Sequence, residues 1–285
     1  MTLLKLSRPG LWFATIWLYL LPTSQMPNLF DSIPFWLGLL YVTFPLNLLV
    51  YGWNDIVDYE ADKFNPRKGN YLFGAKASKE QLDKLWLKII GVQLLFLPFL
   101  FYFIGVKFLG LLIAFCLING LYNLPKNGLR SRPPLELLCQ IGYLLIVPLS
   151  IWLNHTSELH IYAYIYLLLF AFQSHLIGEV MDIEPDRKAG KKTTATILGI
   201  QSTKALIILI VAAEVMMLFY IFKDPIFGSM LGVGLAWLII DLLLIYKSKI
   251  YSVKEMKLFA YLSNLMAILS MSYVWWSGCL LLFRH

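Results

Sequence analysis

The sequence predicts an all-α membrane protein that crosses the bilayer many times. Of its 285 residues, 59% are hydrophobic and only 14% are charged, whereas a soluble domain carries about 25% charged residues. The apolar residues form continuous runs close to the roughly 20 residues that a helix needs to span a bilayer. A transmembrane β-barrel would instead show short segments of alternating polarity. We therefore expect a single transmembrane domain over residues 1–285.

The first apolar run follows Lys5 and Arg8, whose long side chains reach toward the membrane interface and so extend a span. Pro22 follows this run where a signal peptide would carry small residues for cleavage, so we expect a membrane span here. Eight further runs give nine spans, because only helices can satisfy their backbone in such continuous apolar segments. The expected spans are residues 11–21, 34–53, 85–104, 108–124, 135–153, 161–181, 205–222, 227–246 and 258–283.

Proline residues set two of the expected ends. Pro125 follows the fourth span directly. Pro185 disfavours helical geometry at Glu184, so the sixth span is expected to end there. Asp186 would then lie on a turn, where a carboxylate commonly caps the segment that follows.

The basic residues predict the orientation of the chain. With nine spans, only Lys107, Lys223 and Arg284 of the 24 lysines and arginines fall on one side. The side rich in lysine and arginine is normally cytoplasmic. We therefore expect the N-terminus on the cytoplasmic side and the C-terminus outside.

Two acidic stretches share one pattern, residues 55–63 and 179–187. Each reads acid-x-x-Asp-x-Glu-x-Asp-base, and each ends an apolar run on the predicted cytoplasmic side. Carboxylates near a membrane are costly, and like charges at this spacing repel one another. Such a cluster is stable when a cation neutralises it. The repeated pattern therefore predicts that both stretches bind Mg²⁺ and, with it, a diphosphate.

Helical spacing selects the ligands within these stretches. Residues four apart lie on one helix face, which groups Asn54 with Asp58 and Asp62, and Asp182 with Asp186. Oxygen ligands without nearby His or Cys favour a hard ion, and Mg²⁺ typically takes one or two carboxylates while bridging to phosphate. We expect these five residues to be the metal ligands. Basic residues on the same side are expected to neutralise phosphate oxygens; they are Arg67, Lys68, Lys126, Arg130, Arg132 and Lys188.

These residues resemble the motifs of the UbiA superfamily of intramembrane prenyltransferases. The first motif corresponds to Asn54, Asp55, Asp58 and Asp62, and the second to Asp182 and Asp186 with Lys188, Gly190 and Thr194 after them. Tyr122, Pro125 and Lys126, followed by Arg130 and Arg132, are similar to the family's tyrosine-to-lysine loop after span four. The resemblance covers nearly the whole chain.

The resemblance implies nine helices around a central cavity with a cytoplasmic cap. It implies an isoprenyl diphosphate held by Mg²⁺, whose leaving diphosphate is stabilised as the allylic C–O bond ionises, and a lipophilic acceptor that captures the carbocation. Fixed cations aimed at a leaving group lower such a barrier. Asp58, Asp182, Lys126 and Tyr122 are expected to be catalytic, and Arg67, Lys126, Arg130 and Lys188 to bind the diphosphate.

The acceptor remains open at this point. Many members of the family that act on aromatic acceptors follow the first motif with an Asn-x-Pro-x-Arg-Pro-Leu-like run, whereas this chain has Asn65-Pro66-Arg67-Lys68-Gly69. The acceptor classes considered are an aromatic or quinone precursor, a carotenoid and another lipid, and the difference is compatible with a carotenoid or another lipid. It is also compatible with a UbiA-type terpene cyclase that uses no acceptor.

Polar residues within the spans are candidates for the cavity. Asn47 lies two turns before Asn54 on the same side, and Asn119 lies one turn before Tyr122. His175 in span six is expected to contact the acceptor or to act as a general base. Two acids in later spans, Glu214 and Asp241, are expected to pair with helix neighbours.

A divalent-cation transporter is a more remote alternative. Its acids would line a path across the membrane, whereas these acids gather on one side among bases that repel cations. No nucleic-acid partner is expected, and the sequence does not indicate an oligomeric state.

Overall fold

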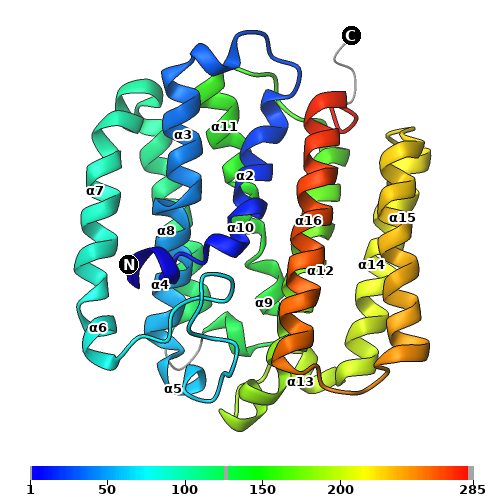
Figure 1. Cartoon of the computed structure of the whole chain (residues 1–285). Coiled ribbons are helices and arrows are strands. Elements are labelled where there is room, and N and C mark those ends of the chain that lie inside the picture. The colour runs from blue at the N-terminus through cyan, green and yellow to red at the C-terminus, as the bar shows by residue number, and fades with distance from the viewer. Residues whose placement is uncertain (1, 125–127, 282–285) are drawn as a thin grey trace. The chain divides into compact units, whose positions relative to one another are not determined.

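Long apolar helices make up most of the chain, which confirms the all-α membrane class. The computed structural model describes residues 2–124 and 128–281 (Figure 1). Within that part of the chain, eight helical segments are long and apolar enough to cross a membrane. These segments are Ile33–Val57, Lys79–Ile104, Val106–Asn123, Leu135–Asn154, Ile161–Lys188, Ile200–Tyr220, Pro225–Ile245 and Val253–Ser277.

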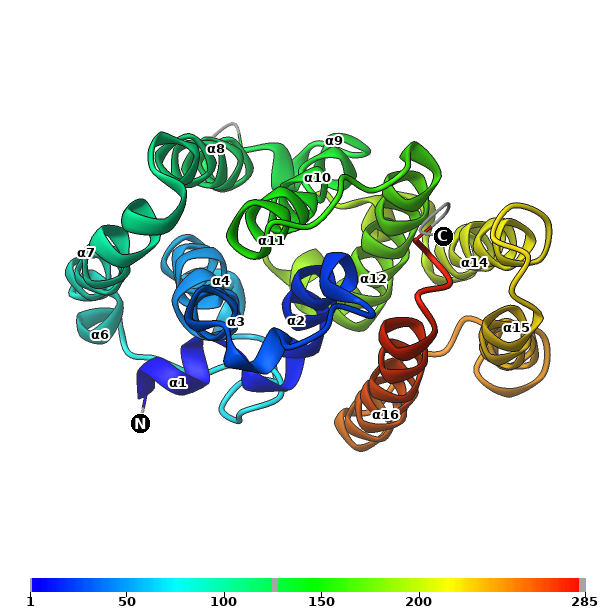
Figure 2. The ribbon, with the colours of Figure 1, turned by 90° about the horizontal axis from the view of Figure 1, so that it is seen from above.

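The first predicted span is shorter than expected. Helix α2 (Trp12–Leu20) has nine residues and is flanked by 3₁₀ turns at Pro9–Leu11 and Leu21–Thr23. A proline lies in the first turn of each of these elements, and because proline has no backbone N–H, it interrupts a continuous α-helical ladder. Helix α2 still packs against α3 (Ile33–Thr43) in both views (Figures 1 and 2). The described chain thus has this short helix and eight longer segments.

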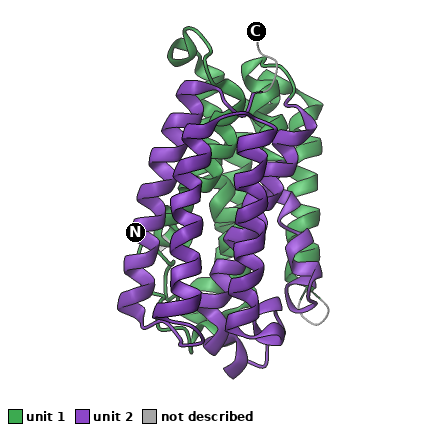
Figure 3. Cartoon of the chain, turned by 90° about the vertical axis from the view of Figure 1, so that its right-hand side faces the viewer, with its two compact units in different colours: residues 1–128, 145–158 green, residues 129–144, 159–285 purple. Residues whose placement is uncertain are grey.

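The chain divides into two compact units, coloured separately in Figure 3. Unit 1 consists of Met1–Gly128 and Leu145–Glu158, and unit 2 of Leu129–Leu144 and Leu159–His285. The other helices of unit 1 are α1 (Thr2–Leu6), α4 (Pro45–Val57), α5 (Tyr59–Asp62), α6 (Lys79–Asp83), α7 (Leu85–Ile104), α8 (Val106–Asn123) and α11 (Ile146–Asn154). Unit 2 contains α9 (Leu135–Leu138), α10 (Ile141–Leu144), α12 (Ile161–Lys188), α13 (Thr194–Leu198), α14 (Ile200–Tyr220), α15 (Pro225–Ile240) and α16 (Val253–Ser277).

A buried tyrosine joins three helices of unit 1. The Tyr19 hydroxyl on α2 donates to the Phe35 carbonyl at 3.0 Å and accepts from Asn154 Nδ2 at 3.2 Å. Ser150 on α11 donates to the Tyr19 carbonyl at 2.5 Å. A Cβ atom at Gly38 would lie 2.2 Å from the Tyr19 hydroxyl, so this close approach requires glycine. These contacts hold α2, α3 and α11 together.

The second predicted span is broken between α3 and α4, at Phe44. Pro45 begins α4 and cannot donate a hydrogen bond back into α3. Asn47 compensates: its Nδ2 donates to the carbonyls of Val42 at 2.8 Å and Thr43 at 2.7 Å. Gln93 on α7 donates to the Pro45 carbonyl at 2.9 Å. Carbonyls at membrane depth need such partners, so these two side chains fix the direction in which α4 carries the first acidic stretch.

Helices α12, α14 and α15 form the centre of unit 2. Their core includes Leu176, Val180, Ile183, Ile207 and Val211. Two acids in the spans are paired, as the sequence predicts. Gln173 donates to Glu214 at 2.9 Å, and Lys204 forms an ion pair with Asp241 at 2.6 Å.

Asp241 opens a π-helical turn, Asp241–Ile245, that ends the segment carrying α15. Its carboxylate also accepts a hydrogen bond from the Tyr251 hydroxyl at 2.7 Å. The Lys204 ammonium lies 4.5 Å from the centre of the Tyr251 ring. The buried charge of Lys204 is therefore balanced within unit 2.

Candidate active site

The first acidic stretch begins on α4 and continues onto α5 through a joint at Asp58. The joint departs only slightly from helical geometry, with φ −89° and ψ 9°. Asp58 N donates to the Asn54 carbonyl and Asp62 N to the Asp58 carbonyl, both at 2.8 Å. The backbone thus keeps the four-residue hydrogen-bond spacing between these three residues.

The oxygen atoms of this stretch suit a hard cation. Asn54 Oδ1 is buried and, within the described chain, has no hydrogen-bond partner. Asp58 is also buried, and the Asp62 side chain is 22% exposed. A buried acceptor without a partner is costly unless a ligand satisfies it. The described residues contain no group of three or more His, Cys, Asp or Glu placed to hold a metal ion.

Asp55 has a different task, and the sequence did not predict it. The side chain is almost fully buried, and its carboxylate shares the Lys68 ammonium with Asp62. Asp55 Oδ1 accepts from Arg8 at 2.6 Å and from Lys68 at 2.5 Å. Arg8 precedes α2, so this network fastens the N-terminal segment to the end of α4. Burial acts to lower the pKa of Arg8, but the charge of Asp55 outweighs it and raises that pKa above its ordinary value.

Lys68 links the network to a predicted metal ligand. Its ammonium lies 2.9 Å from Asp62 Oδ2 as well as 2.5 Å from Asp55 Oδ1. Burial and the nearby charge of Asp55 raise the pKa of Asp62 to about 6, although Lys68 acts to lower it. Lys68 thus serves as the counter-ion of Asp62 in this arrangement.

The loop after α5 is folded tightly enough to position its basic residues. Asn70 Nδ2 donates to the Arg67 carbonyl at 2.7 Å, and Asn70 Oδ1 accepts from Phe73 N at 2.9 Å. Gly69 has a φ of 109°, a conformation that favours glycine. The Arg67 guanidinium is buried over the Phe73 ring, 4.8 Å from its centre. Arg67 is therefore held by the loop's own packing.

The remaining predicted residues of unit 1 lie on α4 and α8. Asn119 and Tyr122 are partly buried near the end of α8, and Asn119 Nδ2 donates to the Phe115 carbonyl at 2.9 Å. Asn47 is fully buried at the break before α4, where its amide nitrogen also donates to Thr15 at 2.9 Å. Lys126, predicted to be catalytic, lies outside the described residues.

The second acidic stretch lies at the end of α12, and one prediction about it is wrong. The helix does not end at Glu184 but continues through Pro185 to Lys188. Pro185 lies only three residues before the end, so the helix loses a single hydrogen bond there. The last turn is held by Ala189 N, which donates to the Pro185 carbonyl at 3.0 Å, and by Lys191 N, which donates to the Asp186 carbonyl at 2.8 Å.

The continuous helix places the predicted residues of unit 2. Asp186 is buried on α12 rather than on a turn, with its Oδ1 3.8 Å from the Lys191 ammonium. Asp182 is partly buried one turn earlier, and Lys188 is exposed at the last position of the helix. Arg130 lies in a 3₁₀ turn, Leu129–Ser131, before α9.

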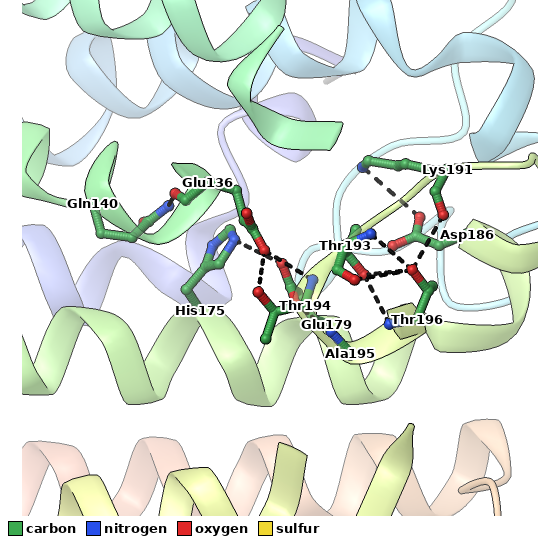
Figure 4. Close-up of polar contacts among 10 residues, drawn as sticks. All are labelled: Glu136, Gln140, His175, Glu179, Asp186, Lys191, Thr193, Thr194, Ala195 and Thr196. Carbon is green, nitrogen blue, oxygen red and sulfur yellow. Dashed lines mark hydrogen bonds and ion pairs between the residues drawn. The ribbon is translucent and has the colours of Figure 1, made fainter. Parts of the chain in front are cut away.

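Two buried acids hold the segment that follows this stretch, shown in Figure 4. Glu136 on α9 is fully buried and accepts from both the backbone N–H, at 2.8 Å, and the hydroxyl of Thr194. Glu179 Oε2 accepts from Ala195 N at 3.0 Å, and Glu179 Oε1 lies 3.2 Å from His175 Nε2. The acid that opens the second acidic pattern is therefore engaged in packing α13 against α12. Sequence reasoning did not identify Glu136, which stands alone between apolar residues.

Comparisons with known proteins agree with this architecture. A model of the UbiA prenyltransferase family matches residues 11–265. A lycopene elongase/hydratase of Corynebacterium glutamicum is 29% identical over 201 residues, which cover 68% of each chain. A protein of the same name from Haloarcula japonica is 29% identical over 207 residues, covering 70% of this chain and 68% of its own.

A solved structure shares the fold over nearly the whole chain. It is a UbiA homolog from Archaeoglobus fulgidus bound to DMAPP and Mg²⁺, with a TM-score of 0.67 and 18% sequence identity. The match covers 95% of this chain and 99% of that one. The family match includes both acidic stretches and most of the membrane-spanning helices. The chain therefore belongs to the UbiA prenyltransferase family and is a multi-pass membrane prenyltransferase.

Proposed function

We propose that this enzyme transfers an isoprenyl group from an isoprenyl diphosphate to an acyclic carotenoid such as lycopene. The observation that carries the proposal is the 29% identity to lycopene elongase/hydratases over about two thirds of the chain. The loop after the first acidic stretch supports it, because Asn65-Pro66-Arg67-Lys68-Gly69 departs from the run found in members that act on aromatic acceptors.

In this proposal, Mg²⁺ is bound by Asn54, Asp58 and Asp62 of unit 1 and by Asp182 and Asp186 of unit 2. The buried, unpartnered Oδ1 of Asn54 supports the first set, and the repeated acidic pattern supports the second. When bound, Mg²⁺ would withdraw negative charge from the diphosphate and so favour ionisation of the allylic C–O bond.

The basic residues complete the proposed diphosphate site. Arg67, Arg130, Lys126 and Lys188 donate hydrogen bonds to phosphate oxygens and so stabilise the leaving group as negative charge develops on it. Tyr122 contributes a hydroxyl donor for the same purpose. Asn47, Asn119 and His175 belong to the part of the cavity that receives the prenyl chain or the acceptor.

The charge distribution supports an orientation for the enzyme. We propose that the N-terminus and both acidic stretches face the cytoplasm and the C-terminus lies outside, because lysine and arginine gather on one side of the predicted spans. Labelling of single cysteines introduced at Lys79 and at Lys223, with a membrane-impermeant reagent on intact cells, tests this. Only the cysteine at position 223 should react.

The central test uses the purified protein in lipid nanodiscs with Mg²⁺, dimethylallyl diphosphate and lycopene. We expect lycopene lengthened by one and two five-carbon units, detected by liquid chromatography and mass spectrometry. Asp58→Asn and Asp182→Asn should each abolish this product, because each removes a carboxylate that neutralises the metal. Glu80→Gln is the matched control: Glu80 is an exposed acid whose carboxylate lies 2.9 Å from the Lys84 ammonium, so its removal should leave activity unchanged.

Two further experiments distinguish Mg²⁺-dependent prenyl transfer to lycopene from the alternative functions. Chelation by EDTA should stop the reaction, and excess Mg²⁺ should restore it; full activity in EDTA would contradict the metal sites. Incubation with the diphosphate alone tests the terpene cyclase alternative. A cyclic hydrocarbon or alcohol formed without lycopene, at the rate of the full reaction, would favour the cyclase and refute transfer.

A further inference from the structure

His175 lies on the same face of α12 as the second acidic stretch. Because α12 is continuous from Ile161 to Lys188, the spacing of His175, Glu179, Asp182 and Asp186 places all four side chains on one stripe of the helix. At a rise of about 1.5 Å per residue, His175 lies about 10 Å deeper in the membrane than Asp182. A group that binds Mg²⁺–diphosphate at Asp182 would place its hydrocarbon in this deeper region.

Glu179 lies beside the imidazole of His175. The carboxylate is fixed at its other oxygen by Ala195 N at 3.0 Å, while Oε1 lies 3.2 Å from His175 Nε2. Both side chains leave α12 on the side of Glu136 and Thr194 (Figure 4). Glu179 Oε1 and His175 Nε2 lie within ion-pair distance without forming a hydrogen bond, so the carboxylate acts on the imidazole through its charge. The charged imidazole that forms after proton uptake is then stabilised by the same carboxylate.

We propose that His175 is the proton acceptor that ends the prenyl transfer reaction and that Glu179 is its positioning residue. The inference rests on the proposed function. As the C–O bond of the allylic diphosphate breaks, its electron pair leaves with the diphosphate. The π electrons of a terminal double bond of the acceptor form the new C–C bond, which leaves a tertiary carbocation on the acceptor. This cation must lose a proton or gain a hydroxyl group to give a stable product.

Both endings deliver one proton to the imidazole of His175. In the first, a C–H bond beside the cation breaks, its electron pair forms a new double bond, and His175 takes the proton. In the second, the oxygen of a water molecule forms a C–O bond to the cation, and His175 takes an O–H proton to leave a tertiary alcohol. General bases of this kind accelerate their step by about 10²–10⁴-fold.

The test separates ionisation from the final proton transfer. Full-length protein in nanodiscs receives Mg²⁺, dimethylallyl diphosphate and lycopene, and both diphosphate release and elongated lycopene are measured. His175→Ala should release diphosphate within about threefold of the wild-type rate but yield about a hundredfold less elongated product. Added imidazole should restore product in His175→Ala, which a merely structural role of His175 would not allow.

Two matched variants make the outcome specific. Glu179→Gln keeps an acceptor for Ala195 N–H but removes the charge, and it should change the ratio of alkene to alcohol while the protein stays folded. His155→Asn is the histidine control, because His155 is exposed with a φ of 52°, a conformation that asparagine tolerates. It should behave as wild type.

Each result decides a different claim. If wild-type protein converts lycopene but His175→Ala yields the same products at the same rates, His175 is not the proton acceptor. If His175→Ala loses diphosphate release and product together without rescue by imidazole, the residue acts in binding or folding, and the inference is also wrong. If the wild-type protein fails to lengthen lycopene, the proposed function itself is refuted, and this inference with it.

Discussion

The two acidic stretches are built in opposite ways around a similar sequence. In unit 1, a buried carboxylate, Asp55, is neutralised by two cations from distant segments, Arg8 and Lys68. In unit 2, the corresponding acid, Glu179, accepts a backbone hydrogen bond and faces a histidine, while Glu136 accepts from Thr194. The first stretch is therefore held by ion pairs and the second by hydrogen bonds to a neighbouring helix start.

This difference concerns the acid at the first position of each pattern. That position lies three residues before the central aspartate, Asp58 or Asp182, and in both units it is directed into the protein. The first acid of each pattern, Asp55 or Glu179, is thus structural, whereas the later acids have a different role. The later acids remain as metal ligands in our proposal, and the first acid holds the segment that carries them.

Removal of Asp55 should have the largest effect on stability. Asp55→Ala leaves two cations near one another without a carboxylate, and breaking a buried ion pair in this way costs about 3–5 kcal/mol. Thermal unfolding in detergent should show a clearly lower midpoint. Glu60→Ala is the control, because the Glu60–Lys63 pair is exposed and such pairs contribute about 0–1 kcal/mol. Equal midpoints for the two variants would show that the Asp55 network does not stabilise unit 1.

Removal of Glu136 should have the next largest effect and should act only in unit 2. Glu136→Ala leaves the N–H and hydroxyl of Thr194 without their buried acceptor, at a cost of about 1–3 kcal/mol. Hydrogen exchange should become faster at the start of α13 and remain unchanged in the Asn65–Phe73 loop of unit 1. Faster exchange in both places would show that the effect of Glu136 is not confined to the start of α13.

Hydropathy predicted most of the fold, whereas these supporting contacts were not predictable. Long apolar runs define where helices cross the membrane, so α7 was predicted with its observed ends, residues 85–104. Breaks within a run leave hydropathy unchanged, and the break at Phe44 was therefore missed. Asp55 was assigned no role because its partner Arg8 is 47 residues away, and a single sequence does not show which distant charges meet.

In the candidate site, too, local spacing was predictable from the sequence, whereas the course of the helix at Pro185 was not. The four-residue spacing predicted that Asn54, Asp58 and Asp62 share one side, because hydrogen bonding between successive turns is local. The spacing of the second stretch was also predicted, but the prediction that the helix ends before Pro185 was wrong. Pro185 removes only the hydrogen bond to the Met181 carbonyl, and the turn that follows is held by Ala189 N and Lys191 N, which donate to the Pro185 and Asp186 carbonyls.

Replacement of Lys68 should change two affinities in opposite directions. Lys68→Met removes the counter-ion of Asp62, so the first stretch should bind Mg²⁺ about tenfold more tightly in the absence of diphosphate. The same variant should bind dimethylallyl diphosphate more weakly, because a cation near the phosphate is lost. Calorimetric titration with each ligand measures both effects. Lys63→Met is the control, because Lys63 forms an ion pair with the exposed Glu60. A weaker Mg²⁺ affinity in Lys68→Met than in wild type would show that Lys68 does not compete with the metal.

The smallest effect is expected at the two prolines. Pro185→Ala restores one N–H within a helix that is already continuous but makes the unfolded chain more flexible, so stability should change by about 1 kcal/mol or less, and prenyl transfer should stay within about twofold of wild type. Pro45→Ala changes a real break, whose freed carbonyls are already satisfied by Asn47 and Gln93. A new N–H at position 45 would donate to the Tyr41 carbonyl and straighten the break, which would redirect α4 and lower activity more than Pro185→Ala does. Prenyl transfer activity and the midpoint of thermal unfolding are measured for both variants. Equal losses of activity would mean that the α3–α4 break does not orient the first acidic stretch.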